Sequence, residues 1–322
     1  MNIRVQELFD DRVTLEGNKI ILTLNTYEDV EANQDQTCKI FSDKWNVAEK
    51  STDVSKLYDF QLEWFLKLYG FESETDFKNF LKSKNTIIDT GCGLGYKAAW
   101  FAKLAPHALV IGIDLSDSLD IASKNYKDIP NLFFYKCDIN NTVLKECVID
   151  FVVCDQVIMH TEIPEKTFEH LSSITSSAGE FACYVYSKKA LPRELIDDYF
   201  RKATHDISAE KIWGLSEQLT ILGKSLSDLK VSFTCPDIPL LGIKGGNYDI
   251  QRFIYWNFLK CFWKEEWGFD LSKITNFDWY APSNAKRFSK DEFLKMATDN
   301  KLSVTFLHEE EACYSARFAK GI

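Results

Sequence analysis

Three glycines at alternate positions are the residues whose spacing points most directly to chemistry. They are Gly91, Gly93 and Gly95, with Cys92 between the first two. They follow the short apolar run TIIDT, which contains Asp89. Glycine lets a backbone turn tightly and approach a ligand, and the free amides at the start of a helix favour polar or anionic ligand groups. A strand, a glycine turn and a helix that starts near Gly95 therefore predict a site for a nucleotide-type cofactor.

The ligand of such a turn depends on its spacing. A phosphate-binding loop of the GxxxxGK[ST] type needs Lys-Ser or Lys-Thr, and neither follows this turn. A dinucleotide site prefers GxGxxG, whose third glycine would lie one position after Gly95. On these residues alone, a purely structural strand-to-helix turn stays open as well.

Three further apolar runs end in acids. ALVIGID ends at Asp114, NLFFYKCD ends at Asp138, and IDFVVCD ends at Asp155, with His160 five positions later. The carboxyl ends of parallel strands meet at one edge of an open sheet, where ligands bind. We therefore expect Asp89 and these three acids around one cleft, with His160 at its rim.

The elements that position these residues alternate between short apolar strands and amphipathic helices from residue 85 to residue 186. This alternation predicts an α/β fold with a doubly wound, mostly parallel sheet. The strands are apolar almost throughout, which is typical of strands covered on both faces. A helix over 289–300 and two further apolar strands close the chain.

Three regions are expected from these patterns. An N-terminal extension covers 1–84 and contains a hairpin over 12–24 and a helical segment over 54–81. The α/β domain comprises 85–186 and 287–322, and a helical, aromatic-rich insertion over 187–286 separates its two parts. Within the insertion we expect helices over 192–204, 208–229 and 249–267, followed by an aromatic-rich loop that contains Asp278, Trp279 and Tyr280.

Composition excludes several classes of function. The net charge of −10 gives no overall attraction for nucleic acid or an anionic membrane. No apolar run approaches the ~20 residues of a membrane span, so we expect no membrane insertion. Nine scattered cysteines without a CxxC pair indicate reduced thiols and a cytoplasmic location. Asp155 followed by Gln156 makes no carboxylate cluster, so we expect no metal.

The spacing Asp89-x-Gly91-x-Gly93-x-Gly95 resembles motif I of the class I S-adenosylmethionine-dependent methyltransferases. The resemblance implies a seven-stranded, Rossmann-like methyltransferase fold that binds S-adenosyl-L-methionine and releases S-adenosyl-L-homocysteine. In this family the turn wraps the amino-acid end of the cofactor, and the leading acid contacts the cofactor through its amino group or water.

The same resemblance assigns roles at the other strand ends. Asp114, followed by Leu115, matches the acid that takes the ribose hydroxyls. Asp138 matches the acid that accepts from the adenine amino group, and Ile139 the apolar residue that packs on the ring. The stretch DFVVCDQVIMHT, which carries Asp155, resembles the family's motif IV and the histidine that follows it.

Two looser likenesses concern bacterial members that act on surface polysaccharides and secondary metabolites. Phe41 and Trp45 resemble a Phe-x-x-x-Trp element that folds over the cofactor, although simple core anchoring of the extension stays open. NFDWYAP resembles a segment before the last helix, so Asp278, Trp279 and Tyr280 are expected in the acceptor pocket.

These observations predict a methyltransferase that acts on a small-molecule acceptor, at a hydroxyl of a sugar or secondary metabolite. His160 is the candidate general base, because a histidine with an ordinary pKa is mostly neutral at cytoplasmic pH; capping the next helix or packing beneath the cofactor are its alternatives. The next candidates for the general base are Asp249, Asp278 and Tyr280. N-methylation, a non-methylating cofactor-binding protein, a nicotinamide dehydrogenase (which would leave Asp138 unexplained) and a homodimeric assembly stay open.

Overall fold

A central β-sheet organises the chain in the computed structural model, which describes all residues except 1, 11, 24–31, 50–53, 204–206 and 321–322. Its strands are β1 (Val13–Glu16), β2 (Lys19–Leu22), β3 (Thr86–Thr90), β4 (Leu109–Asp114), β5 (Leu132–Lys136), β6 (Ile149–Cys154), β7 (Thr175–Ser187), β10 (Arg287–Phe288), β11 (Leu302–Glu309) and β12 (Cys313–Lys320). They lie in the order β1-β2-β5-β4-β3-β6-β7-β12-β11, with β10 paired to β7 outside this path.

The pairing is parallel from β2 through β7 and antiparallel at both edges. The predicted doubly wound sheet of seven strands is confirmed as β3–β7, β11 and β12. The predicted N-terminal hairpin is present, but it does not stand apart, because Lys19 and Ile20 of β2 pair with Phe134 and Tyr135 of β5. The hairpin and β10 together extend the sheet to ten strands.

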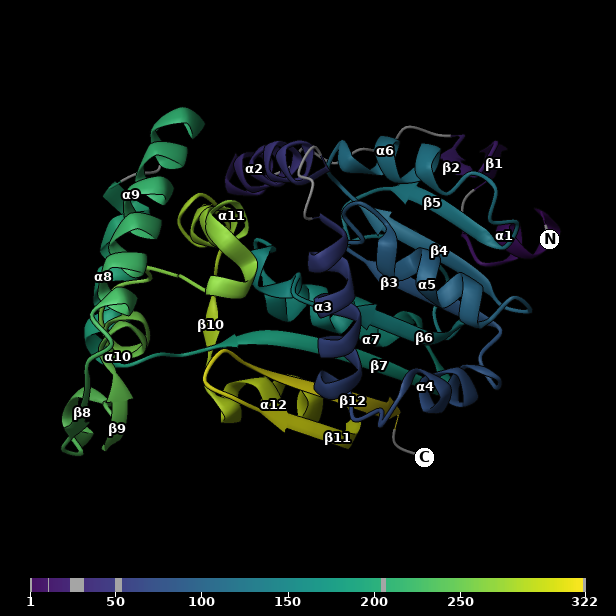
Figure 1. The fold of residues 1–322 in the computed structure, drawn as a ribbon. Coiled ribbons are helices and arrows are strands. Elements are labelled where there is room, and N and C mark those ends of the chain that lie inside the picture. The colour runs from purple at the N-terminus through teal and green to yellow at the C-terminus, as the bar shows by residue number, and fades with distance from the viewer. Residues whose placement is uncertain (1, 11, 24–31, 50–53, 204–206, 321–322) are drawn as a thin grey trace.

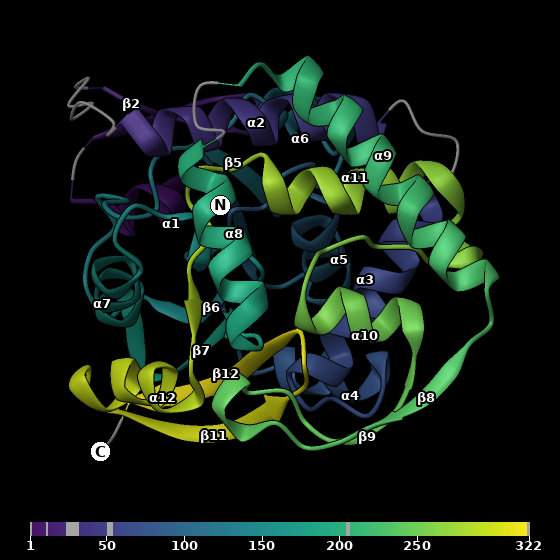
Figure 2. The ribbon, with the colours of Figure 1, turned by 90° about the vertical axis from the view of Figure 1, so that its left-hand side faces the viewer.

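Helices cover both faces of the sheet (Figures 1 and 2). One face carries α3 (Val54–Leu68), α4 (Glu74–Leu81) and α5 (Tyr96–Leu104), and the other carries α7 (Pro164–Ile174) and α12 (Lys290–Asp299). The remaining helices of this part are α1 (Asn2–Glu7), α2 (Ala32–Glu49), α6 (Ser118–Asn125) and the short 3₁₀ helix η1 (Ile158–His160). Fully buried Phe65, Phe77, Phe101 and Phe151 pack between α3, α4, α5 and β6, and each contributes roughly 1.5–3 kcal/mol by its burial.

A second group of elements lies beyond one end of the sheet (Figure 1), and Figure 2 faces it. It consists of α8 (Leu191–Ala203), α9 (Ala209–Asp228), β8 (Ser232–Cys235), η2 (Pro239–Leu241), β9 (Gly246–Asp249), α10 (Ile250–Asn257), η3 (Glu265–Trp267) and α11 (Gly268–Tyr280). β8 and β9 pair as a separate antiparallel hairpin.

Two expectations for this group were wrong. The helix predicted over 249–267 begins at Ile250, where Asp249 caps it by accepting from two backbone amides, and it already ends at Asn257. The predicted aromatic loop is instead helix α11. Its buried side includes Asn276, whose amide group donates to Thr220 Oγ1 (2.9 Å) and accepts from the Phe262 amide (2.8 Å). A buried polar residue of this kind obscures the helical apolar pattern that the sequence would otherwise show.

Candidate active site

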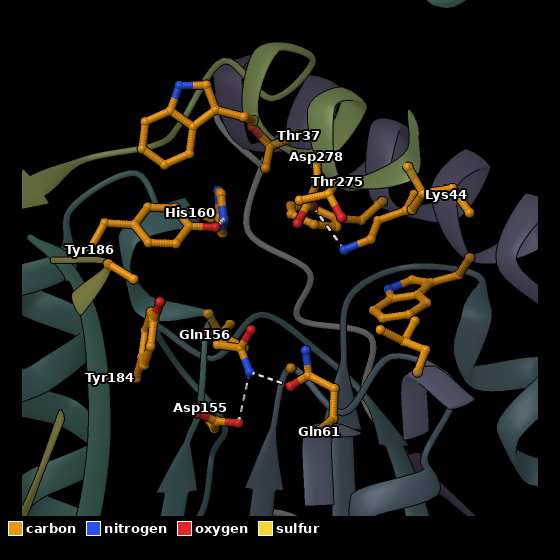
Figure 3. Close-up of a pocket in the computed structure, with 18 of the residues that line it drawn as sticks. Thr37, Lys44, Gln61, Asp155, Gln156, His160, Tyr184, Tyr186, Thr275 and Asp278 are labelled. Carbon is orange, nitrogen blue, oxygen red and sulfur yellow. Dashed lines mark hydrogen bonds and ion pairs between the residues drawn. The ribbon is translucent and has the colours of Figure 1, made fainter. Parts of the chain in front are cut away.

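A cavity of about 470 Å³ opens at the carboxyl ends of β3, β4, β5 and β6. Its volume falls in the range of small-molecule sites, roughly 300–1,000 Å³. One side, here called the strand-end side, is formed by the residues that follow these strands and by α3, and α2 lies over the cavity. The opposite side, here called the insertion side, is formed by residues that follow β7 and by α8, α10 and α11. Figure 3 shows Asp155 and Gln156 at the strand ends, with Gln61 of α3 beside them. Thr37 and Lys44 of α2 and Thr275 and Asp278 of α11 face them across the cavity.

The structure brings most of the predicted site residues to this cavity. Those that line it are Phe41, Trp45, Gly91, Cys92, Asp114, Leu115, Asp138, Ile139, Asp155, His160, Asp278 and Trp279. Four predicted residues, all within the described chain, are not part of its lining: Asp89, Gly93, Gly95 and Tyr280. Tyr280 contacts Phe200 of α8 instead, with ring centroids 5.0 Å apart.

Each glycine of the turn has a positive φ, and its neighbours show why glycine is needed. A Cβ atom on Gly91 (φ +71°) would overlap the side chain of Val157. One on Gly95 (φ +76°) would lie 2.9 Å from Phe134. One on Gly93 (φ +54°) would lie 2.8 Å from the ring of Trp45. Packing inside the protein therefore fixes Gly91 and Gly95, whereas Gly93 faces the aromatic side chain that covers the turn.

Asp114 holds the turn in place as well as lining the cavity. Its Oδ2 accepts from the Gly93 amide (2.7 Å), and its Oδ1 accepts from the amide (2.8 Å) and hydroxyl (2.6 Å) of Ser116. The Asp114 carboxylate is nevertheless partly exposed in the cavity lining, where it can also accept from a ligand hydroxyl. Burial raises the pKa of Asp114 while these hydrogen bonds lower it, and the net direction is upward.

Sequence reasoning missed a buried ion pair beneath the cavity. Lys97, in the first turn of α5, lies 2.6 Å from Asp155 Oδ2, and Tyr69 donates to Asp155 Oδ1 at 3.0 Å. Burial opposes the charged form of Lys97, but the nearby acids outweigh it and raise its pKa. Asp89 is also buried beside Lys97, and its burial raises its pKa to about 7. One feature of the sequence could have revealed this ion pair: Lys97 directly precedes the apolar helical segment AAWFA.

The N-terminal extension closes over the cavity through α2, which carries Phe41 and Trp45. Lys44 of this helix forms an ion pair with Asp278 of α11 at 2.7 Å (Figure 3). Gln36 donates to the carbonyl of Ala281 (3.0 Å) and accepts from the amide of Ser283 (2.9 Å). These contacts join two segments that are more than 200 positions apart, and we call this set of contacts the α2–α11 clamp.

His160 lies in η1 at the junction of the two sides. Its Nδ1 is 2.6 Å from the carbonyl oxygen of Asn284. Its Nε2 is 3.3 Å from the hydroxyl of Tyr186, which lies beside it in Figure 3. A carbonyl only accepts, so Nδ1 carries the proton and Nε2 presents its lone pair. Burial lowers the pKa of His160 to about 4, so the ring is neutral at pH 7. The histidine can accept a proton there, although its low pKa makes it a weaker base than an ordinary histidine.

The part of the chain that supplies the strand-end residues matches a known protein family. Residues 81–231 match a family described as a methyltransferase domain. They include the glycine turn, the strand-end acids and His160. The chain carries a class I, S-adenosylmethionine-dependent methyltransferase domain.

Relatives of this methyltransferase domain agree over shorter stretches. A malonyl-[acyl-carrier protein] O-methyltransferase of Halalkalibacterium halodurans is 32% identical over 91 residues, which is 27% of this chain and 34% of the relative. The protein of the same name from Bacillus anthracis is 28% identical over 90 residues, 27% of this chain and 33% of the relative. The chain thus matches about a third of the length of these curated relatives. A magnesium protoporphyrin IX methyltransferase from Synechocystis PCC 6803, solved with bound S-adenosylmethionine, has a TM-score of 0.47 and 12% identity, covering 92% of this chain and all of that one.

The residues that line or cover the cavity fit S-adenosylmethionine in three respects. Asp114 lines the cavity at the end of β4, and Asp138 lines it at the end of β5. Ile139 lines the cavity next to Asp138 and offers an apolar surface for a base. The Trp45 ring covers Gly93, where the turn leaves no side chain of its own.

None of the described helices combines the length and hydropathy of a membrane span, and the described residues contain no cluster suited to a metal ion.

Proposed function

We propose that this chain transfers a methyl group from S-adenosylmethionine to a hydroxyl oxygen of a small-molecule acceptor, such as a sugar or a secondary metabolite. The observation that carries the proposal is one continuous cavity. It runs from the acids at the strand ends to an aromatic wall on the insertion side, past the Nε2 lone pair of His160. When bound, the cofactor supplies a methyl group on a sulfonium, which is open to in-line attack by a nucleophile.

The chain's own residues supply binding, alignment and exclusion of water. We assign Asp114 to a ribose hydroxyl, Asp138 and Ile139 to the adenine ring, and Phe41 and Trp45 to the cover over the cofactor. The α2–α11 clamp then limits the access of water and holds both reactants in one orientation, which is the main catalytic need of a methyl displacement. We assign to His160 the role of removing the proton from the acceptor hydroxyl, because His160 lines the cavity and its Nε2 is unprotonated.

The proposed division of labour follows the regions of the chain. Residues 85–186 and 287–322 hold the cofactor, residues 1–84 cover it, and residues 187–286 bind the acceptor. The names of the curated relatives support oxygen as the methylated atom, since both are O-methyltransferases.

Turnover with an acceptor panel tests this proposal. The protein is incubated with S-adenosylmethionine and with sugars, sugar acids and phenolic metabolites, and S-adenosylhomocysteine and methylated products are measured by mass spectrometry. We expect acceptor-dependent S-adenosylhomocysteine and a product in which a methyl group replaces a hydroxyl hydrogen. Cofactor binding without turnover of any panel member would instead favour a non-methylating binding protein.

A variant of the insertion side adds a control for the site. Trp279 lines the cavity and is also packed with Leu219 and Cys261, so Trp279→Phe is preferable to a truncation. We expect a higher KM for the acceptor with unchanged cofactor affinity. A lower melting temperature with unchanged KM would mean that Trp279 only stabilises the fold.

A further inference from the structure

The insertion side of the cavity carries a concentration of positive charge that the chain as a whole does not have. Five basic residues line it, although the net charge of the chain is −10. We call them the basic cluster: Lys189, Arg193, Arg252, Lys260 and Lys264. They come from the segment after β7, from α8 and α10, and from the loop before η3.

Most of this charge has no acidic partner. Within the described chain, Arg193 is the member of the basic cluster with a carboxylate partner, Asp197 at 2.8 Å. Lys189 donates to backbone carbonyls and to the hydroxyl of Ser187. The carboxylate that lines the insertion side, Asp278, is paired with Lys44 of α2. Four basic side chains therefore border the cavity without an ion pair to a carboxylate among the described residues.

Lys260 shows most clearly that the basic cluster lacks acidic partners. It is 7% exposed, and no hydrogen bond or ion pair of its ammonium group is found among the described residues. The group lies over the ring of Trp279, 4.5 Å from its centroid. Burial lowers its pKa to about 7, with Asp278 opposing and Arg193 adding to this shift. A buried ammonium without a counter-charge is costly, and such groups concentrate at ligand sites, where the ligand supplies the charge.

Aromatic side chains surround the basic cluster. Lys264 lies 5.2 Å from the ring centre of Phe60 and 5.3 Å from that of Trp267. Tyr255 and Trp256 of α10 add two further rings to the lining. Rings positioned this way hold the cationic heads at the cavity and offer flat apolar surfaces to the body of a ligand.

We propose that the acceptor is an anion, a carboxylate or phosphate carried on a flat apolar body, and that the basic cluster binds this anionic group. The inference deepens the proposed methyl transfer and rests on it. Asp114 and Asp138 line the strand-end side and repel an anion, and the charge of Asp155 is balanced by Lys97. The basic cluster, in contrast, attracts an anion. This polarity orients the acceptor with its charged end toward the insertion and its nucleophilic end toward the strand ends.

Three probes of one shape test the inference: 1-naphthoate, 1-naphthyl phosphate and the neutral 1-naphthamide. Their affinities are measured by calorimetry, with and without saturating S-adenosylhomocysteine. We expect at least one anion to bind tenfold or more tightly than the amide, in both conditions. The stronger of the two anions identifies carboxylate or phosphate as the natural group.

Two lysine variants and one control complete the experiment. Lys260→Met should lower the affinity for the anions at least fivefold without changing the affinity for the amide. Lys264→Met, at a less buried position, should also lower the affinity for the anions. Lys273→Met is the matched control, because Lys273 lies in α11 but pairs with Glu217 outside the cavity lining. It should leave all three affinities unchanged.

Several results would overturn the inference. These are equal affinities for anions and amide, undetectable binding of all three probes, or an anion preference that survives both cavity variants. Competition between the anions and S-adenosylhomocysteine would assign the cations to the cofactor's own carboxylate instead. Failure of S-adenosylhomocysteine to bind, with the anion preference intact, would refute the proposed methyl transfer while supporting the anion site.

Discussion

Replacing Lys97 by methionine perturbs a buried charge pair at the cavity. The change keeps an unbranched side chain of similar length and removes the ammonium that lies 2.6 Å from Asp155 Oδ2. Asp155 retains its hydrogen bonds from Tyr69 (3.0 Å) and Gln156 (3.2 Å). Its carboxylate, however, stays buried without a counter-charge, next to the second buried acid Asp89.

The expected loss is large because the partner is left behind. Removing one member of a buried pair costs about 3–5 kcal/mol in free energy of unfolding. An unfolding entropy of about 2.1 cal/mol/K per residue converts this to a melting temperature lower by about 4–8 °C for a chain of this length. Lys67→Met is the matched control, since Lys67 is 63% exposed and pairs with Glu310 at 3.3 Å. Exposed pairs of that kind contribute about 0–1 kcal/mol.

Urea and thermal unfolding, followed by tryptophan fluorescence, measure both variants. The double variant Lys97→Met/Asp155→Asn should recover part of the loss, because it removes the unpaired carboxylate as well. The reasoning would be refuted if Lys97→Met cost no more than Lys67→Met, or if the double variant were as unstable as the sum of the two single variants.

Three further predictions concern the turn, the ribose acid and the histidine. Asp114→Ala should lower cofactor affinity at least tenfold by calorimetry, as one charge-assisted hydrogen bond contributes about 1.5–3 kcal/mol. It should also lower the melting temperature, because Asp114 holds the turn. Gly91→Ala should destabilise the fold by more than Gly17→Ala, whose added Cβ meets open space at a similar φ; equal melting temperatures would contradict this. His160 has a pKa near 4 when folded and about 6.5 when unfolded, so the unfolded chain binds the proton first as the pH falls. The wild type should therefore lose on the order of 3 kcal/mol between pH 6.5 and 4 from this residue, and His160→Gln should show a flatter dependence of melting temperature on pH.

Local patterns were sufficient for the sheet and for one side of the cavity. Strands β3 to β6 are short apolar runs, and each acid expected at a strand end lies where the run predicts it. Asp114 and Asp138 therefore reach the cavity as expected. Asp89 does not, because its side chain is buried beside Lys97 and lies outside the cavity lining.

The other side of the cavity could not be predicted from local patterns. The basic cluster is spread over residues 189–264, and no short stretch within that range is strongly basic. Its members meet because α8, α10 and the loop before η3 pack together, which depends on contacts between distant segments. The α2–α11 clamp has the same origin, since Lys44 and Asp278 are far apart in the sequence. The hydrophobic pattern of α11 was hidden by its buried polar residues.

Calorimetric titration with S-adenosylhomocysteine tests most directly whether this cavity holds the cofactor as described. The account predicts binding at one site per chain, weakened at least tenfold by Asp114→Ala and more modestly by Asp138→Ala, since a solvent molecule can replace the latter carboxylate at the adenine amino group. Asp128→Ala, at an exposed position after α6, should bind like the wild type. Absence of binding, or binding that neither cavity variant weakens, would contradict the account.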